Sequence, residues 1–152
     1  TLKIVTSKPV NNYKKNIQIL TGDWKKNLLT DEQILSLYVG SKFVVIPLID
    51  TIQPAGQSVC LQAMSCFKPV IMSNISGLWD HTKLIHRENI FLVKPGNSTL
   101  LNSSINELLS DKILYKKLLG EMLIPILSPL LVIGVSLDVL LDMLDVFVEM
   151  LD

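Results

Sequence analysis

The sequence is poor in the residues that metal centres and disulfide frameworks need. Its 152 residues include only two cysteines and two histidines. Cys60 and Cys66 lie six positions apart in a segment with helical spacing, which points them in different directions, so we expect two reduced, buried thiols. His81 and His86 are five apart, which does not place them on one helix face, and a third ligand is not evident. We therefore expect surface or loop histidines and no metal.

Net charge is also lacking, and with it the signature of a nucleic-acid-binding protein. The 14 basic residues balance 14 acidic ones, and the basic pairs at 14–15 and 25–26 are not part of a patch interleaved with aromatic residues. The uncharged apolar run at residues 122–137 contains Pro125 and Pro129 and is shorter than the roughly 20 residues of a membrane-spanning helix. A signal peptide is not visible either. These absences predict a cytoplasmic protein with no nucleic-acid partner.

The balanced total hides an asymmetry along the chain. Every basic residue lies at or before Lys117, together with eight of the acids, so residues 1–120 carry +6 and residues 121–152 carry −6. A chain of this length corresponds to about one domain. We predict a domain over residues 1–120 and an atypical apolar and acidic tail over residues 121–152. Because the chain begins at Thr1 instead of Met, we interpret it as a fragment.

Apolar runs typical of strands alternate with segments of helical spacing along the first 120 residues. Strands are predicted at residues 2–6, 16–20, 43–48, 69–73 and 90–93, and helices at 30–40, 56–66 and from 101 to 120, with a short helical turn at 77–84. The near-continuous apolar run 43–48 is typical of a central strand covered on both faces. This alternation predicts an α/β fold with a parallel sheet, right-handed crossovers and helices on both faces.

Two of the predicted helices carry further detail. Thr30 and Gln33 fit a capping box, in which each side chain bonds the backbone of the other residue. In the helix at 56–66, the spacing places Val59, Ala63 and Cys66 on one face, with two further apolar side chains beside it.

The stretch QPAGQSVCLQAM, residues 53–64, is the candidate binding segment. It follows the strand at 43–48, and ligands of parallel α/β sheets bind where such strands end and helices begin. A helix start offers unpaired N–H groups and about half a positive charge, which suits a phosphate. Gly56 would allow close approach of a ligand, and the amides of Gln57 and Ser58 would face it. By itself, a lone glycine at a helix start is more often a structural turn.

Residues 37–97 contain several motifs in a characteristic order. They are a tyrosine-containing helix and strand at 38–47, a glycine followed by LQAM, then KPVI, SGLWD and ENIFLVKPGN, and NSSINELLSD follows them. In this order and spacing they resemble the second, Rossmann-like domain of retaining glycosyltransferases with the two-domain B fold, the large group that includes sucrose and glycogen synthase relatives. The resemblance covers about residues 1–120, which would then be part of the C-terminal half of such an enzyme, a domain incomplete at its N-terminus.

The resemblance implies transfer of a sugar from a nucleotide-activated donor, bound mainly by this domain, to an acceptor that the sequence does not identify. The family's second glutamate, which binds the nucleotide ribose, matches Gln62. Its first glutamate, which meets the donor sugar, falls at Pro54, and Gln53 is the nearest polar residue. Glutamine keeps hydrogen bonds but supplies no charge. The candidate donor site is therefore Gln53, Gly56, Gln57, Ser58 and Gln62, with no metal and no cofactor.

Other parts of the family pattern are not in this sequence. The basic residues that hold the diphosphate, and the acceptor-binding domain, lie upstream of the segment matched by residues 2–6, so we expect no glycosyl transfer by this chain alone. Lys42 and Lys68 flank strands, and we interpret both as solvated strand ends. We interpret Trp79 as a packing residue.

A second class of function stays open. In a non-catalytic Rossmann-like interaction module, the two glutamines would record lost chemistry. The tail would then mediate assembly, since its acidic residues from 138 to 152 recur at spacings of 4, 3, 4 and 3 on an otherwise apolar helix. The tail resembles nothing in the family, and its sequence fits a self-associating or partner-binding helix, an interfacial membrane element, or the product of a shifted reading frame.

Overall fold

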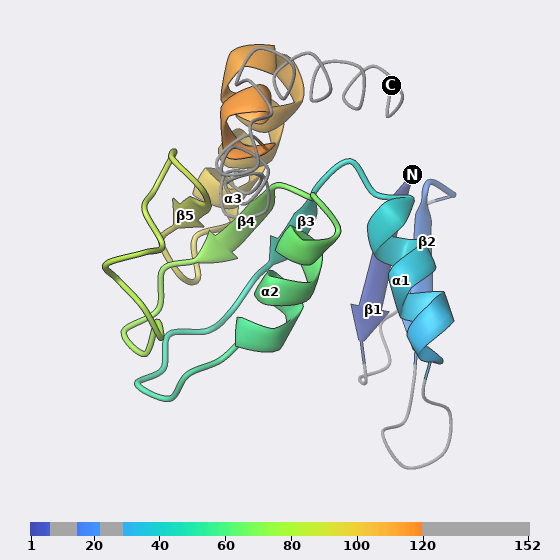
Figure 1. Cartoon of the computed structure of the whole chain (residues 1–152), viewed down its shortest axis with the longest axis horizontal. Coiled ribbons are helices and arrows are strands. Elements are labelled where there is room, and N and C mark those ends of the chain that lie inside the picture. Colours follow the sequence, from blue (N-terminus) through green and yellow to red (C-terminus); the bar gives the residue numbers. More distant parts are fainter. Residues whose placement is uncertain (7–14, 22–28, 120–152) are drawn as a thin grey trace, which may run out of the picture. The chain divides into compact units, whose positions relative to one another are not determined.

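The structure is a computed structural model of the chain, and it describes residues 1–6, 15–21 and 29–119 (Figure 1). The chain divides into two compact units, Thr1–Leu37 and Tyr38–Asp152, which are described separately. The predicted tail, residues 121–152, lies outside the described residues.

The first unit contains two parallel strands and most of a helix. Strand β1 (Leu2–Thr6) pairs in parallel with β2 (Ile17–Thr21), one residue later than the predicted strand at 16–20. Helix α1 (Asp31–Val39) begins after the predicted capping box. The Thr30 amide donates to Gln33 Oε1 at 2.9 Å, and the Gln33 amide donates to Thr30 Oγ1 at 3.3 Å. This confirms the capping box and explains why the helix begins at Asp31.

The second unit contains a three-stranded parallel sheet in the order β3-β4-β5. Its strands are β3 (Val44–Ile46), β4 (Val70–Ser73) and β5 (Phe91–Val93). The prediction that the run 43–48 forms the central strand was wrong for this sheet, because β4 lies in the middle and is buried at every position. Strand β3 ends before Pro47, which has no N–H to donate to a neighbouring strand.

Helices cover both faces of this sheet, as predicted. The side chains of Val70 and Met72 belong to the same buried cluster as Cys60 and Ala63 of helix α2 (Gln57–Ser65). Ile71, between them, packs in a second cluster with Leu108 of helix α3 (Ser98–Ser110) and with residues from 112–119. Alternate side chains of one strand therefore reach two separate cores.

The buried face of α2 differs from the predicted one. Cys60 and Ala63 are fully buried, whereas Val59 is 39% exposed and Leu61 48% exposed. Cys66 is half-buried instead of buried. The helix is apolar on more than one side, so spacing alone did not decide which stripe faces the sheet, and contact with β3 and β4 selects Cys60 and Ala63.

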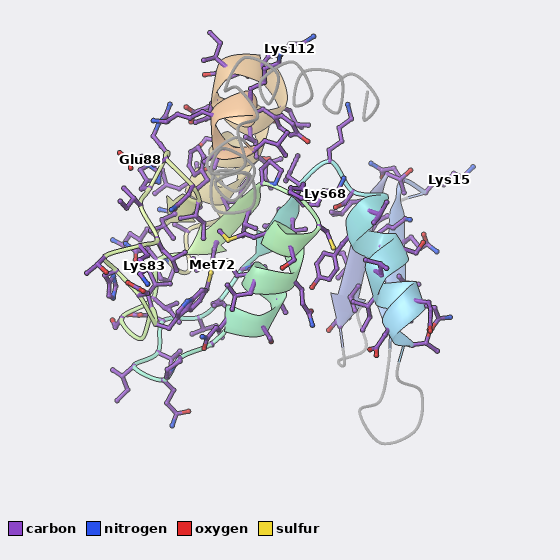
Figure 2. The ribbon with its side chains drawn as sticks, in the orientation of Figure 1. Lys15, Lys68, Met72, Lys83, Glu88 and Lys112 are labelled. Carbon is purple, nitrogen blue, oxygen red and sulfur yellow. The ribbon has the colours of Figure 1, made fainter. Side chains whose placement is uncertain are left out.

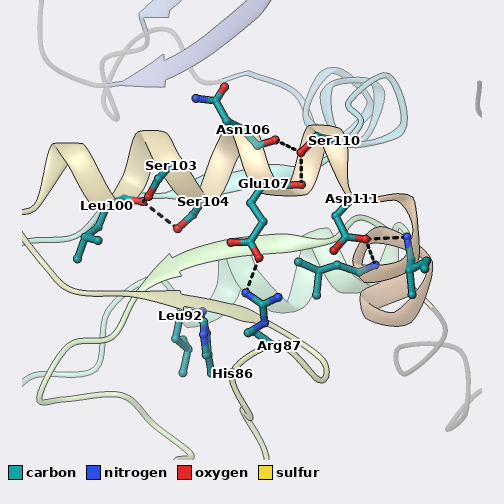
Figure 3. Close-up of polar contacts among 12 residues, drawn as sticks. His86, Arg87, Leu92, Leu100, Ser103, Ser104, Asn106, Glu107, Ser110 and Asp111 are labelled. Carbon is teal, nitrogen blue, oxygen red and sulfur yellow. Dashed lines mark hydrogen bonds and ion pairs between the residues drawn. The ribbon is translucent and has the colours of Figure 1, made fainter.

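Two further predictions need correction. Helix α3 does not continue to Gly120: it ends at Ser110, and Asp111 is extended. The Asp111 carboxylate then accepts from the amides of Ile113 (3.0 Å) and Leu114 (2.9 Å), so it caps a separate helical segment at residues 112–119 (Figure 3). The predicted helical turn at 77–84 is a series of turns, in which one bond of helical type joins the Leu84 amide to the Asp80 carbonyl at 3.0 Å.

Candidate functional site

The carboxyl ends of β3, β4 and β5 lie at one edge of the sheet because the three strands are parallel. The loop from Pro47 to Gly56 leaves β3 at this edge, and the loop beginning at Asn74 leaves β4 there. Figure 1 shows both chain segments leaving the same end of the sheet. This is where ligands bind in open α/β folds. The five predicted donor-site residues lie in the first loop and the first two turns of α2.

Gly56 is the N-cap of α2 and has a left-handed backbone, with φ of 75°. A Cβ added there would lie 3.0 Å from Ile46 Cγ2, 3.0 Å from Met72 Cε and 3.1 Å from Leu48 Cδ1. The sequence interpretation assigned this glycine to close ligand approach. The structure gives it a packing reason: only glycine takes this backbone conformation freely, and the missing side chain leaves room for the core beneath the helix.

The first turn of α2 is open. No side chain caps the helix, and its first turn carries no acidic residue. The Cys60 amide makes the first helical bond, to the Gly56 carbonyl at 2.9 Å, so the preceding amides include those of Gln57 and Ser58. Both residues are exposed. The start of α2 therefore presents backbone donors and the positive end of the helix dipole at the carboxyl edge of the sheet.

Gln62 is exposed on the second turn of α2 and contacts a residue that the sequence analysis did not assign to the site. The Tyr38 hydroxyl donates to Gln62 Oε1 at 3.1 Å and lies 3.5 Å from the Val59 carbonyl oxygen. Burial of the Tyr38 ring raises the pKa of its hydroxyl, and the nearby thiols of Cys66 and Cys60 raise it further. Tyr38 is therefore a neutral donor that holds the amide oxygen of Gln62.

Gln53 lies in the loop before α2 and is also exposed. Its backbone N–H donates to Thr51 Oγ1 at 3.1 Å. Along the chain, Gln53 thus precedes the start of α2 and Gln62 follows it. The backbone amide of Gln53 bonds to Thr51, and the side chain of Gln62 bonds to Tyr38. The same loop is tied to the loop after β4 by Asp50, which accepts from the Ser76 amide at 2.8 Å and from Ser76 Oγ at 3.2 Å. Asp50 and Ser76 are not among the site residues predicted from the sequence, because 26 residues separate them.

A comparison with protein families matches residues 22–119 to the family model described as Glycosyl transferases group 1. The chain belongs to this glycosyltransferase family. No curated protein matches it. The match confirms the resemblance found in the sequence, and with the parallel sheet it confirms a Rossmann-like α/β fold.

One basic residue of this glycosyltransferase is not where the sequence analysis expected it. Lys68 is only 3% exposed, so its interpretation as a solvated strand end was wrong (Figure 2). Its amide donates to the Ala63 carbonyl at 3.0 Å, which turns the chain inward after α2. Burial lowers the pKa of the Lys68 ammonium, and the neighbouring Cys66 opposes that shift. Lys42 is exposed, as predicted.

The remaining candidates have structural partners. Trp79 packs against the buried cluster under α2, which confirms its interpretation as a packing residue. His86 Nδ1 accepts from the Leu92 amide at 3.0 Å, and its ring meets Phe91 edge to face. Both cysteines are free, and burial raises the pKa of the Cys60 thiol to about 12, so this thiol is inert.

Metal-binding clusters and membrane-spanning helices are both absent from the described part of the chain. Residues 1–6, 15–21 and 29–119 contain no group of three or more His, Cys, Asp or Glu side chains that could hold a metal ion. Within the same ranges, the helices are too short or too polar to cross a lipid bilayer.

Proposed function

We propose that this glycosyltransferase chain binds a nucleotide-activated sugar at the start of α2. In this arrangement the diphosphate accepts hydrogen bonds from the amides of Gln57 and Ser58, the ribose contacts Gln62, and the sugar lies near Gln53. Gly56 sets the position of the helix start. The observation that carries the proposal is the open first turn of α2 at the carboxyl edge of a parallel sheet, in a chain of this family.

Physical chemistry favours a diphosphate at this position. The helix dipole places about half a positive charge at its N-terminus. An acidic residue in the first turn would oppose an anionic ligand, and α2 has none there. The neighbouring carboxylate of Asp50 is already engaged with Ser76, so it does not compete with the ligand for these amides.

Glycosyl transfer then requires an acceptor. The family implies an acceptor in general, which would be a sugar, a lipid or a protein. The donor nucleotide, the donor sugar and a cytoplasmic location stay predictions from the sequence. So does the division into a domain at residues 1–120 and a tail at 121–152. The proposal involves no metal and no cofactor.

A non-catalytic interaction module is the second candidate, and one observation favours it. Neither Gln53 nor Gln62 carries a charge, and Pro54 stands where the family has a glutamate, so the site lacks both carboxylates of the family pattern. Such a module would keep the fold and lose donor binding. The two candidates therefore differ in whether a nucleotide binds.

Hydrogen exchange with nucleotides tests the proposal. UDP, GDP and ADP are added in turn, and one of them should slow exchange of the Gln57 and Ser58 amides. Gln62→Ala should weaken binding of that nucleotide by about 1 kcal/mol, the value of one hydrogen bond. Gln18→Ala is the matched control, because Gln18 is an exposed glutamine of β2 in the other compact unit, and it should leave the affinity unchanged.

The alternative outcome is equally specific. If none of the three nucleotides protects either amide, donor binding is absent and the interaction module is the better description. Protection confined to other segments would place the ligand elsewhere on the sheet.

A further inference from the structure

The loop that carries Gln53 is anchored at its two ends, where Leu48 and Ala55 pack against the core beneath α2, and its middle lies outside that core. Ile49 is 88% exposed and Ile52 is 86% exposed, so neither anchors the loop in a core. Asp50 and Gln53 are exposed as well. Burial of Ile49 and Ile52 therefore does not position residues 49–53, the part of the loop that carries Gln53.

The opposing loop after β4 is firmly anchored. Ile75 and Leu78 are buried in the cluster beneath α2 and flank Ser76 and Gly77 on either side. The Leu78 amide also donates to the Ile75 carbonyl at 3.1 Å, which closes a turn around the pair. Ser76 and Gly77 are thus held by the core.

Three hydrogen bonds join the middle of the loop before α2 to the loop after β4. The Asp50 carboxylate accepts from both the amide and the hydroxyl of Ser76, at 2.8 and 3.2 Å. The Gly77 amide donates to the Thr51 carbonyl at 2.7 Å. The two bonds from Ser76 lower the pKa of Asp50, its amide having the largest effect, so the carboxylate is charged at neutral pH.

Gly77 adds a steric condition to this contact. A Cβ added to it would lie 2.5 Å from the carbonyl carbon and oxygen of Ile52 and 2.6 Å from the carbonyl oxygen of Gln53. Real Cβ atoms do not come so close to backbone, so any side chain at this position would push the loop away. The two backbones therefore touch directly beneath Gln53.

We propose that Asp50, Ser76 and Gly77 are positioning residues for the donor's sugar, because they fix the loop that presents Gln53 beside the start of α2. The proposal rests on the donor site described under Proposed function. The name latch is used here for Asp50, Ser76 and Gly77 together. The latch acts on the sugar end of the ligand, while the diphosphate is held by the amides of α2, which the latch does not contact.

Matched ligand pairs separate these two ends. Affinities of the full chain are measured for UDP, GDP and ADP and for the corresponding nucleotide glucose compounds, so each pair differs only in the sugar. The ratio of the affinity for the nucleotide glucose compound to the affinity for the diphosphate measures what the sugar contributes. Asp50→Ala should lower this ratio about tenfold, since it removes two hydrogen bonds of a charged group. It should change the affinity for the diphosphate alone less than twofold. Gly77→Ala should act in the same direction.

Two further variants guard against a merely structural effect. Asp50→Asn keeps one acceptor for the Ser76 amide and should recover part of the affinity gained from the sugar. Asp111→Ala removes a carboxylate that caps residues 112–119, and it should lower stability while leaving the ratio of the two affinities unchanged. Hydrogen exchange at Ser76 and Gly77 should accelerate in Asp50→Ala and not in Asp111→Ala.

The outcomes that contradict the latch differ from those that contradict donor binding. A wild-type chain that binds none of the diphosphates overturns the donor site and the latch's role with it. If the wild type binds a diphosphate but gains nothing from glucose in any pair, or if Asp50→Ala weakens both ligands of a pair equally, the donor site stands and the latch does not position the sugar.

Discussion

At the scale of single residues, the contact between Tyr38 and Gln62 determines what the second turn of α2 offers a ligand. The tyrosine hydroxyl donates to Gln62 Oε1 at 3.1 Å, which leaves the amide N–H groups of Gln62 free to donate. A glutamate at this position would keep one oxygen for the tyrosine and present the other as a charged acceptor. The glutamine therefore changes both the charge and the hydrogen-bonding sense of the site.

A double-mutant cycle tests whether Tyr38 acts through Gln62. Tyr38→Phe should weaken nucleotide binding by about 0.5–1 kcal/mol, because a freely rotating glutamine must be ordered by the ligand. In the Gln62→Ala background the same change should have no effect, and isothermal titration calorimetry measures both differences. Gln62→Glu should tighten binding about fivefold, since hydrogen bonds to charged groups are the stronger ones.

Tyr115→Phe is the matched control for this cycle. Its hydroxyl donates to the Lys42 carbonyl at 2.8 Å, away from α2, so its loss should lower stability without altering nucleotide affinity. If Tyr38→Phe weakens nucleotide binding equally with and without Gln62, then Tyr38 supports the fold and does not orient Gln62 toward the ribose.

At the residue scale, the sequence could predict hydrogen bonds between neighbouring residues but not those between distant ones. The Thr30–Gln33 capping box was predictable because both partners lie within one helical turn. The partners Tyr38 and Gln62 are 24 residues apart, and Asp50 and Ser76 are 26 apart. Residue type and local spacing do not encode such pairs, because the pairs form only once the strands are placed in order. Burial of Lys68 was missed for the same reason.

At the scale of elements, β5 begins at a hydrogen bond from a backbone amide to a histidine. His86 Nδ1 accepts from the Leu92 amide, which requires a neutral ring (Figure 3). Partial burial lowers the His86 pKa from its ordinary 6.5; the charge of Arg87 lowers it further, and Glu107, which pairs with Arg87, opposes the shift. His86 thus bonds to β5, while the neighbouring Arg87 pairs with Glu107 of α3.

This arrangement predicts a fall in stability on mild acidification. Because the pKa is lower in the folded chain, the unfolded chain binds more protons below about pH 6.5, and the free energy of unfolding declines as the pH falls toward the folded pKa. The loss should stay below about 1 kcal/mol, the value of one hydrogen bond, because the His86 ring is exposed and solvent screens the interaction. Thermal melts of the wild type and of His86→Ala between pH 7.5 and 5 measure it, and the variant should show the shallower decline.

His81→Ala is the control for losing a histidine, and it should retain the decline of the wild type. If His86→Ala and the wild type lose stability in parallel over this range, the decline arises from other groups. The carboxylates of Asp50 and Asp80, whose hydrogen bonds lower their pKa, lose their contribution only at more acidic pH.

The elements themselves were largely predictable, and the exceptions share a cause. Strands and helices fell within a few residues of their predicted ranges because apolar periodicity follows burial. The break at Asp111 was missed because the helical spacing of Leu108, Tyr115 and Leu118, at i, i+7 and i+10, continues across it. Hydrophobic patterns also carry no strand order, so the short run at 70–73 was not recognised as the middle strand.

At the scale of the whole molecule, the family match runs from residue 22 to residue 119 and so covers parts of both compact units. The sequence predicted this membership because several motifs occur in a fixed order, which is more specific than any one of them. The site is less determined: the fold explains Gly56 by packing, and the donor contacts of Gln53 and Gln62 remain proposals. Order along the chain therefore identifies the scaffold, while the chemistry depends on contacts between distant loops.

Residues 121–152 lie outside both the family match and the described residues, and their sequence alone carries the last prediction. On a helix, the acidic residues from Asp138 to Asp152 form one stripe, and the remaining sides are apolar. Each fully buried side chain of this kind contributes about 1.5–3 kcal/mol, so leaving several exposed is unfavourable. Folding against one sheet face would cover only part of the helix.

We therefore expect the full chain to self-associate and a variant ending at Gly120 to be more soluble. Analytical ultracentrifugation of both at several concentrations measures the difference. A full-length variant with Leu140, Leu144, Phe147 and Leu151 changed to serine is the matched control: it keeps the length and the acidic stripe of the tail, and it should sediment as the shorter chain does. A full chain that sediments as a single monomeric species would show that the tail packs within its own chain, because nothing apolar would then be left to drive association.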